Sequence, residues 1–242
     1  MISVCIATYN GEKYIKAQLE SILAQIGQDD EIIVSDDNST DNTISEIESL
    51  NDNRIKVKKN RKTIKKESQH KVFQLMDKIR LNFENALVEA KGDYIFLADQ
   101  DDIWKEDKVK SILKMLEDYD CVVHDCEVWN GEKVTINSFF EYFKTGRNLF
   151  YSLLKSPFMG CCMAFNKKIL NKAVPYPDMH VEHDTYIGLC AFKYGNVGFC
   201  DKKLIKYRRH EDNVSPCADD NTNSLYIKLI RRLYMLVSLI KA

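Results

Sequence analysis

The sequence predicts an α/β protein built around a mostly parallel sheet, and two observations support this class. Short apolar runs that are typical of buried strands alternate with longer stretches in which apolar residues recur every three or four positions. This alternation is typical of parallel sheets whose strands are joined by right-handed helical crossovers. With 242 residues, of which 45% are hydrophobic and 29% charged, the chain is long enough to bury a substantial core.

The first half of the chain follows this pattern closely. Residues 2–8 predict a buried strand that leads into a turn at Gly11, and a helix over 14–26 follows. Residues 31–35 predict a second buried strand, and helical spacing resumes over 43–50. The order of these elements indicates neighbouring parallel strands joined by helices.

Two more strands complete this half. The alternating segment 54–58 predicts a partly exposed third strand, and residues 72–90 predict a long helix that Gly92 stops. Residues 94–97 then form a fourth apolar strand. We expect these strands to share one sheet, because strands joined by helical crossovers usually lie parallel and close together.

The second half is less regular. Apolar runs and helical spacing predict strands over 121–124, 163–165 and 198–204, and helices over 109–116, 167–173 and 184–194. Residues 127–150 place many aromatic side chains among polar ones. This composition favours a binding loop over a core strand.

Composition argues against several functional classes. The formal net charge is −1, which gives no global reason to expect nucleic-acid binding. The eight cysteines include the adjacent pair Cys161 and Cys162 but no Cys-x-x-Cys pair, which argues against a disulfide framework or a structural zinc site. Reduced thiols and an N-terminus without a leader segment favour a cytoplasmic protein.

Polar clusters follow three of the predicted strands, at residues 8–11, 36–41 and 99–102. The carboxyl ends of parallel strands lie at one edge of a sheet, and ligands bind beyond that edge. We therefore expect the three clusters to converge on one site, as a nucleotide site requires.

The densest cluster is Asp99-Gln100-Asp101-Asp102, which places three carboxylates within four positions. Like charges this close raise one another's pKa unless a cation neutralises them. Mg²⁺ and Mn²⁺ prefer oxygen ligands, and Mg²⁺ is usually held by one or two carboxylates together with substrate phosphates. The cluster therefore indicates a site for a metal–diphosphate substrate, with a solvated acidic turn as the alternative. Asp102 is expected to cap the helix that follows.

Five segments recur in a characteristic order and spacing, namely 4–11, 32–41, Asp99-Gln100-Asp101, His183-Asp184 and 207–214. Together they resemble the motifs of the inverting nucleotide-sugar glycosyltransferases of family 2, which have the GT-A fold, and Asp99-Gln100-Asp101 resembles the DxD motif of that family. The resemblance covers roughly residues 2–215. The segments 99–104 and 160–166 are most similar to the bacterial rhamnosyltransferase-type members.

The resemblance implies roles for residues that bind the nucleotide of the donor. Thr8 and Tyr9 are expected to shape the nucleoside pocket, and Asp37, with Asp36 beside it, to contact the base. A carboxylate suits the N–H donor of a pyrimidine. The alternative is that the segment 36–41 only provides the N-cap of the next helix.

The resemblance also implies a divalent metal, Mn²⁺ or Mg²⁺, at the donor diphosphate. Asp101 is the expected ligand, Asp99 is expected to reach the ribose or the same metal through water, and His210 to bind metal or phosphate. A metal in this place balances the charge that builds on the departing nucleoside diphosphate. From the third helix, Lys78 or Arg80 is expected to approach the donor phosphates.

On the acceptor side, the resemblance makes Asp184 the expected general base, which removes the proton of the acceptor hydroxyl as the new bond forms. The alternative is that Asp184 only caps the helix that follows it. His183 is expected to orient or pack, and Arg208 to add positive charge at the diphosphate. Gly160 and Cys161 are expected near the acceptor or the phosphates.

The sequence departs from the family pattern in three places. Lys105-Glu106-Asp107 replaces a usual proline, and Thr185-Tyr186 stands where rhamnosyl-type members carry bulky aromatic pairs. The segment 56–71 is longer and more basic than the usual loop. The last two departures leave the acceptor and the donor sugar open.

The C-terminal segment reads as a linker followed by a helical tail. Lys228, Arg231 and Arg232 interrupt its apolar residues, so it is a poor transmembrane span and resembles a basic amphipathic helix on an anionic membrane surface. Packing on its own domain or on the partner in a homodimer is the alternative. The expected organisation is a GT-A domain at 1–215, with a nucleotide-binding half at 1–104 and an acceptor-binding half at 105–215, and a tail at 216–242.

We therefore expect a metal-dependent inverting glycosyltransferase that moves a sugar from dTDP-rhamnose or a UDP-hexose to a glycan or lipid-linked acceptor. The resemblance implies bacterial surface-polysaccharide synthesis at the inner face of the cell membrane. A nucleotidyltransferase is one alternative, although residues 8–13 are a poor match to the glycine-rich basic loop of that class. A non-catalytic nucleotide-sugar-binding module is the other, although Asp99, Asp101 and Asp184 are all present.

Overall fold

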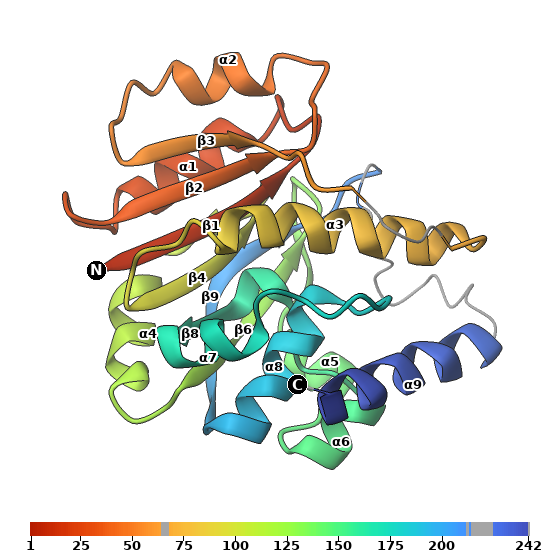
Figure 1. Cartoon of the computed structure of the whole chain (residues 1–242). Helices are drawn as coiled ribbons and strands as arrows, with labels where there is room; N and C mark the ends of the chain where they lie inside the picture. Colours follow the sequence, from red (N-terminus) through yellow and green to blue (C-terminus); the bar gives the residue numbers. More distant parts are fainter. Residues whose placement is uncertain (64–67, 212, 214–224, 242) are drawn as a thin grey trace.

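The computed structural model describes residues 1–63, 68–211, 213 and 225–241. Within these residues, a sheet of nine strands runs through the molecule and carries helices on both faces (Figure 1). The strand order is β3-β2-β1-β4-β8-β6-β9-β5, and β7 pairs with β6. This architecture confirms the predicted fold class.

The half of the sheet that the sequence predicts most clearly is fully parallel. Its inner strands are buried along nearly their whole length and mostly apolar, because helices cover both of their faces. The strands are β1 (Ile2–Thr8), β2 (Glu31–Asp36), β3 (Ile55–Lys59) and β4 (Tyr94–Asp99). The helices between them are α1 (Ile15–Leu23), α2 (Thr43–Glu48) and α3 (Lys71–Leu87).

The other half of the sheet is mixed. β8 (Met163–Asn166) lies antiparallel between β4 and β6 (Cys121–Trp129). β9 (Val197–Arg208) runs parallel to β6. Two short strands, β5 (Ile103–Trp104) and β7 (Val134–Ile136), pair antiparallel with β9 and β6 respectively.

β6 and β9 extend well beyond their predicted bounds, and they pair as far as Trp129 and Arg208. Polar residues in the extensions break the apolar pattern, so these parts do not read as strands. The prediction that residues 127–150 form a binding loop is therefore wrong. It contains the end of β6, the strand β7, helix α5 (Phe139–Phe143) and the start of α6 (Leu149–Leu154).

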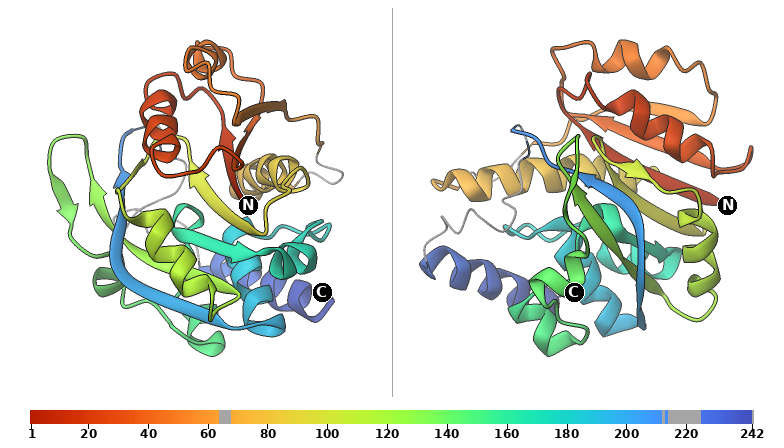
Figure 2. Two further views of the ribbon diagram at one scale, coloured as in Figure 1. Left: turned by 90° about the vertical axis from the view of Figure 1, so that its left-hand side faces the viewer. Right: turned by 180° about the vertical axis from the view of Figure 1, so that it is seen from behind.

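Two groups of helices enclose the sheet (Figure 2). α3, α7 (Lys167–Ala173) and α8 (His183–Tyr194) cover one face, and α1, α2 and α4 (Lys108–Leu116) cover the other. A continuous apolar core fills both interfaces. Between α6 and β8 the chain makes a 3₁₀ turn, η1 (Gly160–Cys162), that faces β4.

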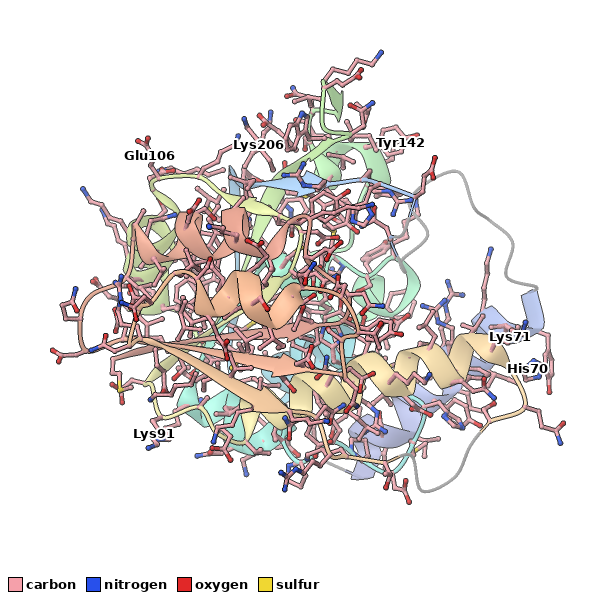
Figure 3. All side chains as sticks on the ribbon, turned by 90° about the horizontal axis from the view of Figure 1, so that it is seen from above. His70, Lys71, Lys91, Glu106, Tyr142 and Lys206 are labelled. Atoms are coloured by element: carbon pink, nitrogen blue, oxygen red, sulfur yellow. The ribbon has the colours of Figure 1, made fainter. Side chains whose placement is uncertain are left out.

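The tail forms helix α9 (Leu225–Lys241), which packs against α8 and the start of α3. The Tyr234 ring meets those of Phe73 and His180, and Met235 and Ser238 are buried. Figure 3 labels His70 and Lys71, which mark the start of α3. The outward face of α9 keeps an apolar row exposed, namely Tyr226, Leu229, Leu233, Leu236 and Ile240. None of the helices in the described ranges has both the length and the hydropathy of a membrane span.

Candidate active site

The carboxyl ends of the parallel strands form the edge at which the polar clusters meet. Thr8 of β1 lies opposite Asp36 of β2, and Ala7 lies opposite Asp99 of β4. The Asn82 side chain of α3 reaches the same edge, where its Nδ2 donates to the backbone oxygen of Thr8 at 3.1 Å. The predicted convergence of these segments is therefore present.

Gln100, inside the DxD motif, connects two of these segments. Its Oε1 accepts hydrogen bonds from the Thr8 hydroxyl at 2.6 Å and from the Tyr9 N–H at 2.9 Å. The Tyr9 side chain itself stays 55% exposed at the rim of the site. Sequence reasoning missed Gln100, because an amide between two carboxylates carries no signal of its partners.

Asp36 and Asp37 have different surroundings. The buried Asp36 carboxylate accepts hydrogen bonds from the N–H and the hydroxyl of Ser39, which closes a turn. Asp37 is half-buried, and its Oδ1 accepts from Asn60 Nδ2 at 2.9 Å. Asp36 therefore shapes the loop, and Asp37 is the more accessible of the two carboxylates.

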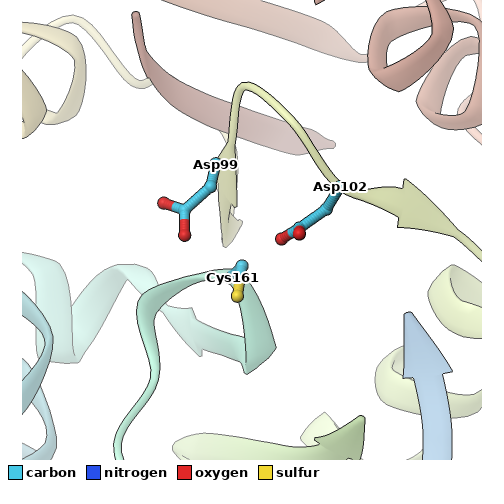
Figure 4. A group of neighbouring side chains, drawn as sticks. All are labelled: Asp99, Asp102 and Cys161. Atoms are coloured by element: carbon cyan, nitrogen blue, oxygen red, sulfur yellow. The ribbon is translucent and has the colours of Figure 1, made fainter. Parts of the chain in front are cut away.

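Asp99, Asp102 and the Cys161 thiol face one another at the end of β4 (Figure 4). One ligand atom from each residue lies within 4.8 Å of the others. The prediction that Asp102 caps the next helix is wrong, because β5 intervenes and α4 begins only at Lys108. Asp102 is instead fully buried, and its Oδ1 accepts from the Arg208 N–H at 2.9 Å.

The chemistry of this acidic group fits a hard divalent ion. Desolvation, with the charges of Asp101 and Asp184, raises the pKa of Asp99 to about 7. Desolvation also raises the pKa of Asp102 well above its usual range, and Asp102 Oδ2 is buried with no hydrogen-bond partner among the described residues. Burial raises the pKa of Cys161 as well, so the thiol is not the thiolate that soft metals prefer. Closely spaced carboxylate oxygens suit Mn²⁺ or Mg²⁺.

Two of the three predicted metal-binding residues, Asp101 and His210, are in direct contact. His210 Nε2 lies 2.8 Å from Asp101 Oδ2, which also accepts from Asn213 Nδ2 at 3.0 Å. The His210 ring packs on Tyr14, with the ring centroids 4.6 Å apart. A carboxylate and an imidazole, both metal-ligand types, thus lie side by side next to the acidic group.

Arg208 holds a positive charge over the same loop. Its Nε donates to the backbone oxygen of Asp101 at 2.8 Å. Its guanidinium lies 4.9 Å from the ring centroid of Tyr14 and 4.4 Å from that of Trp129. Contacts of this kind fix the orientation of a guanidinium. Arg208 is therefore held beside the DxD loop, and its role at a diphosphate stays a prediction.

A buried lysine lies behind the acidic group. Lys108 is fully enclosed, and its Nζ donates to the backbone oxygen of Cys161 at 2.8 Å and lies 4.0 Å from the ring centroid of Trp104. Burial lowers the pKa of Lys108 to about 8, although the nearby Asp102 and Asp99 act in the opposite direction. Sequence reasoning missed this residue, since a lysine at a helix start normally faces solvent.

Asp184 lies in the first turn of α8, which begins one residue earlier than predicted, at His183. Its Oδ2 accepts from the Gly160 N–H at 3.2 Å, and its Oδ1 from the Thr185 N–H at 2.6 Å. Its charge contributes to the raised pKa of Asp99. The Asp184 carboxylate thus faces η1 and lies close enough to Asp99 to raise the pKa of that residue.

His183 packs instead of reaching the site. Its ring stacks on Phe83 with the centroids 4.1 Å apart, and burial lowers its pKa. A Cβ at Gly160 would lie 2.8 Å from the His183 ring, so only glycine fits there without a shift. His183 and Gly160 therefore set the shape of the wall beside Asp184.

Lys78 and Arg80 lie elsewhere on α3. Lys78 is exposed, whereas Arg80 is buried with Asp77 at 3.4 Å and Glu84 at 3.8 Å. Asp77 in turn contacts His180 Nδ1 at 2.6 Å. In the described part of the chain, neither Lys78 nor Arg80 contacts the DxD residues, so the structure does not bring them to the acidic group.

Together, the polar loops and the acidic group form a carboxylate-rich site at the carboxyl ends of the parallel strands, where α/β proteins bind their ligands. The profile of the Glycosyl transferase family 2 matches residues 3–74 and 80–174, and the chain belongs to this family. This membership confirms the family resemblance and the expectation of a glycosyltransferase with a GT-A fold. It also selects glycosyl transfer over the nucleotidyltransferase alternative.

Two curated relatives are similar over most of the chain. The Escherichia coli UDP-Glc:alpha-D-GlcNAc-diphosphoundecaprenol beta-1,3-glucosyltransferase WfgD is 29% identical, over 89% of this chain and 79% of its own length. The Shigella flexneri dTDP-rhamnosyl transferase RfbG is also 29% identical, over 86% of this chain and 72% of its own length. The two relatives use different nucleotide sugars, so the similarity leaves the donor open.

Solved structures share the fold. Residues 1–349 of Staphylococcus aureus TarS, in complex with UDP-GlcNAc, match 98% of this chain and 66% of their own length, with 19% identity and a TM-score of 0.69. The Pyrobaculum calidifontis mannosyltransferase PcManGT, in complex with GDP-Man and Mn²⁺, matches 99% of this chain and 63% of its own, with 20% identity and a TM-score of 0.58. The chain thus spans about two thirds of each of these solved structures.

Proposed function

We propose that the protein is a metal-dependent inverting glycosyltransferase that moves a sugar from a dTDP- or UDP-linked donor to a lipid-linked acceptor. The observation that carries the proposal is the meeting of the DxD carboxylates with His210 at the strand edge that holds Thr8. Such an arrangement of oxygen donors at a sheet edge suits a metal-bound diphosphate. The nucleotide-sugar complexes of TarS and PcManGT, the latter with Mn²⁺, support it.

The donor nucleotide occupies the edge between β1 and β2. The exposed Tyr9 ring is placed to cover the base, and the accessible Asp37 carboxylate to accept its N–H. Asp101, Asp99 and His210 are the residues that would hold the Mn²⁺ or Mg²⁺ ion, with the Asp102 carboxyl beside Asp99. When bound, this ion neutralises the charge that develops on the departing diphosphate.

Asp184 is the general base. Its carboxylate takes the proton of the acceptor hydroxyl while the oxygen forms a bond to the anomeric carbon. The bond between that carbon and the diphosphate oxygen breaks, and the diphosphate leaves with the electron pair, which inverts the configuration. The Gly160 N–H keeps the carboxylate oriented, and Arg208 adds a fixed positive charge on the side of the leaving group.

The two curated relatives support the choice of donor and acceptor. The name of WfgD specifies glucosyl transfer from UDP-Glc to a diphosphoundecaprenol-linked GlcNAc, and that of RfbG a dTDP-rhamnosyl transfer. We therefore place this chain in bacterial surface-polysaccharide synthesis, with a sugar on a polyprenyl diphosphate as acceptor. The exposed apolar row of α9 supports a peripheral position on the membrane, and a second copy of the chain is the alternative occupant of that row.

A donor screen tests this function. The chain is incubated with UDP-Glc, UDP-GlcNAc, dTDP-rhamnose and GDP-Man, each with Mn²⁺, Mg²⁺ or EDTA, and hydrolysis of the donor is measured. We expect metal-dependent hydrolysis of a dTDP- or UDP-linked sugar, and NMR of the transfer product should show an inverted anomeric carbon. Hydrolysis that persists in EDTA contradicts the metal, and transfer with retention contradicts the single displacement.

A further inference from the structure

The inner face of α9 packs on the helix that carries the candidate base (Figure 1). Met235 and Ser238 on this face are buried. Near the end of α8, Lys193 Nζ donates to the backbone oxygen of Leu239 at 2.8 Å. The role proposed above for α9 concerns its outward apolar row and gives no function to these inner contacts.

At the other end of α8, Arg231 of α9 forms an ion pair with Glu182. The two side chains are 29% and 27% exposed, so the pair is largely removed from water. Glu182 is the N-cap residue of α8, but its side chain makes no capping hydrogen bond to the helix backbone. Its carboxylate instead accepts from the Thr185 hydroxyl at 3.2 Å and pairs with Arg231. Side-chain contacts therefore hold the start of α8 where many helices have an N-cap hydrogen bond.

The Thr185 hydroxyl extends these contacts to the segment before η1. It lies 3.3 Å from the Ser156 hydroxyl, and Ser156 Oγ accepts from the Phe158 N–H at 3.2 Å. Together with Arg231 and Glu182, the two hydroxyl groups form what we call the Arg231 network. This network joins the first turn of α8 to the chain that leads into η1.

The same two segments hold the candidate base. The Asp184 carboxylate accepts from the Thr185 N–H in α8 and from the Gly160 N–H in η1. The position of the carboxylate therefore depends on how the first turn of α8 lies relative to η1. The Arg231 network connects these two parts, so a change in α9 can reach the carboxylate through it.

We propose that Arg231 is a positioning residue for Asp184. It holds Glu182, and with it the first turn of α8, where the Asp184 carboxylate meets the acceptor hydroxyl. The proposal rests on the proposed function for the role of Asp184 as the base. A base has to lie within about 2.6–3.2 Å of the proton that it removes. A misplacement of about 1 Å from a change elsewhere can lower the rate about a hundredfold. Arg231 thus controls turnover without touching either substrate.

Kinetics of the full chain test the proposal. Arg231→Gln and Glu182→Gln break the same ion pair, the first from α9 and the second from α8, so that α9 keeps its own sequence in the second variant. Transfer is measured from UDP-Glc or dTDP-rhamnose, with Mn²⁺, to a GlcNAc-diphosphate that carries a short alkyl chain. Calorimetry measures the affinity for UDP or dTDP with Mn²⁺. We expect kcat to fall at least about tenfold in each variant, while the acceptor KM and the nucleotide affinity stay near those of the wild type.

Three further variants identify the route of the effect. The double variant Arg231→Gln/Glu182→Gln should lose no more activity than the single variants, because all of them break one ion pair. Arg231→Lys keeps a positive charge opposite Glu182 and should recover most of the lost kcat. The control Lys193→Gln removes the contact of α9 with the far end of α8 and should keep kcat near that of the wild type.

Hydrogen exchange provides a readout that does not depend on turnover. In Arg231→Gln, peptides that cover residues 158–162 and 183–187 should exchange faster than in the wild type, because the contacts that order these segments are lost. Lys193→Gln should leave the exchange of the same peptides unchanged.

The outcomes separate positioning from other roles of Arg231. A raised acceptor KM with an unchanged kcat shows that Arg231 binds the acceptor, and it overturns the proposal. An equal loss of kcat in Lys193→Gln, or a multiplied loss in the double variant, also overturns it. If the wild-type chain shows neither metal-dependent donor hydrolysis nor transfer, the proposed function has failed. Unchanged hydrogen exchange in Arg231→Gln overturns the positioning role in either case.

Discussion

His210 Nε2 and Asp101 Oδ2 lie 2.8 Å apart, although 109 residues separate them in the chain. Strand β9 makes this contact, because it ends at Arg208 and so delivers His210 to the loop after β4. The proposed metal end of the site therefore draws on two segments that are distant in the chain and that pairing within the sheet brings together.

Replacing Asp101 with alanine is expected to remove metal-dependent donor binding. The variant loses a carboxylate oxygen and the partner that orients His210. Calorimetry with UDP or dTDP and Mn²⁺ should show binding at least about a hundredfold weaker, since even residues behind metal ligands commonly contribute ten- to hundredfold. Asp107→Ala removes an exposed carboxylate that pairs with Lys202, and it serves as the control. Unchanged affinity in Asp101→Ala would remove the metal assignment.

Donor binding with metal should weaken as the pH falls below about 7. Desolvation and the neighbouring carboxylates raise the pKa of Asp99 to about 7, so protons compete with the ion below that value. The same shift has the opposite effect on the metal-free fold: the contribution of Asp99 to stability is largest below pH 3.8 and is lost as the pH rises through about 7. Thermal unfolding between pH 5.5 and 8.5 with Mn²⁺–UDP and with EDTA checks both signs. If the difference in Tm between the samples with Mn²⁺–UDP and with EDTA is the same at all pH values, this prediction is contradicted.

Asp184→Asn should keep donor binding but lose transfer. The amide preserves the hydrogen bond from the Gly160 N–H, yet it cannot take the acceptor proton. General bases contribute about 10²- to 10⁴-fold, so kcat should fall within that range while the affinity for Mn²⁺–UDP stays near that of the wild type. Near-normal turnover would show that another group acts as the base.

Lys108→Met should lower the free energy of unfolding by about 1–3 kcal/mol, because the backbone oxygen of Cys161 loses its buried donor. Urea unfolding in EDTA measures this effect without a contribution from metal. Lys110→Met alters an exposed lysine of the same helix and should change the stability by less than about 0.5 kcal/mol. If Lys108→Met is as stable as the wild type, the hydrogen bond from Lys108 to the Cys161 backbone does not stabilise the fold around the acidic group.

Leu233→Asp should abolish binding to anionic vesicles without unfolding the protein. Leu233 is 57% exposed in the middle of the apolar row of α9, so its replacement removes no core contact but puts a negative charge against the membrane. Vesicle flotation and a thermal melt measure the two properties. If the substitution leaves flotation intact but changes the oligomeric state in light scattering, the row is an interface between two copies.

The parallel half of the fold was predictable because its signals are local. β1 has the predicted bounds, and the segments after β1, β2 and β4 meet at one edge as expected. The long extensions of β6 and β9 were not predictable. Glu127 and Lys206 face each other across the two strands. Polar residues therefore occupy paired strand positions here, whereas in the sequence they resemble an exposed loop.

The site could be predicted only where a motif carries it. Asp101 and His210, which the family resemblance singles out, lie in direct contact, and their roles as metal ligands stay a prediction. Asp102 is a buried partner of the Arg208 N–H and not a helix cap. Gln100 and Lys108 were not predicted as site residues, because no motif in the sequence marks them. Their partners, Thr8 and Cys161, lie far away in the chain, and only tertiary contacts give these residues their roles.

Helix α8 and strand β9 follow one another directly, and they join the proposed base to the proposed cation of the leaving-group side. Asp184 lies in the first turn of α8, and Arg208 closes β9. Packed helices and paired strands open less readily than loops, so this out-and-back unit limits changes in the distance between the two side chains. We therefore expect the loops at the strand ends, rather than α8 and β9, to rearrange when the spent nucleotide is released.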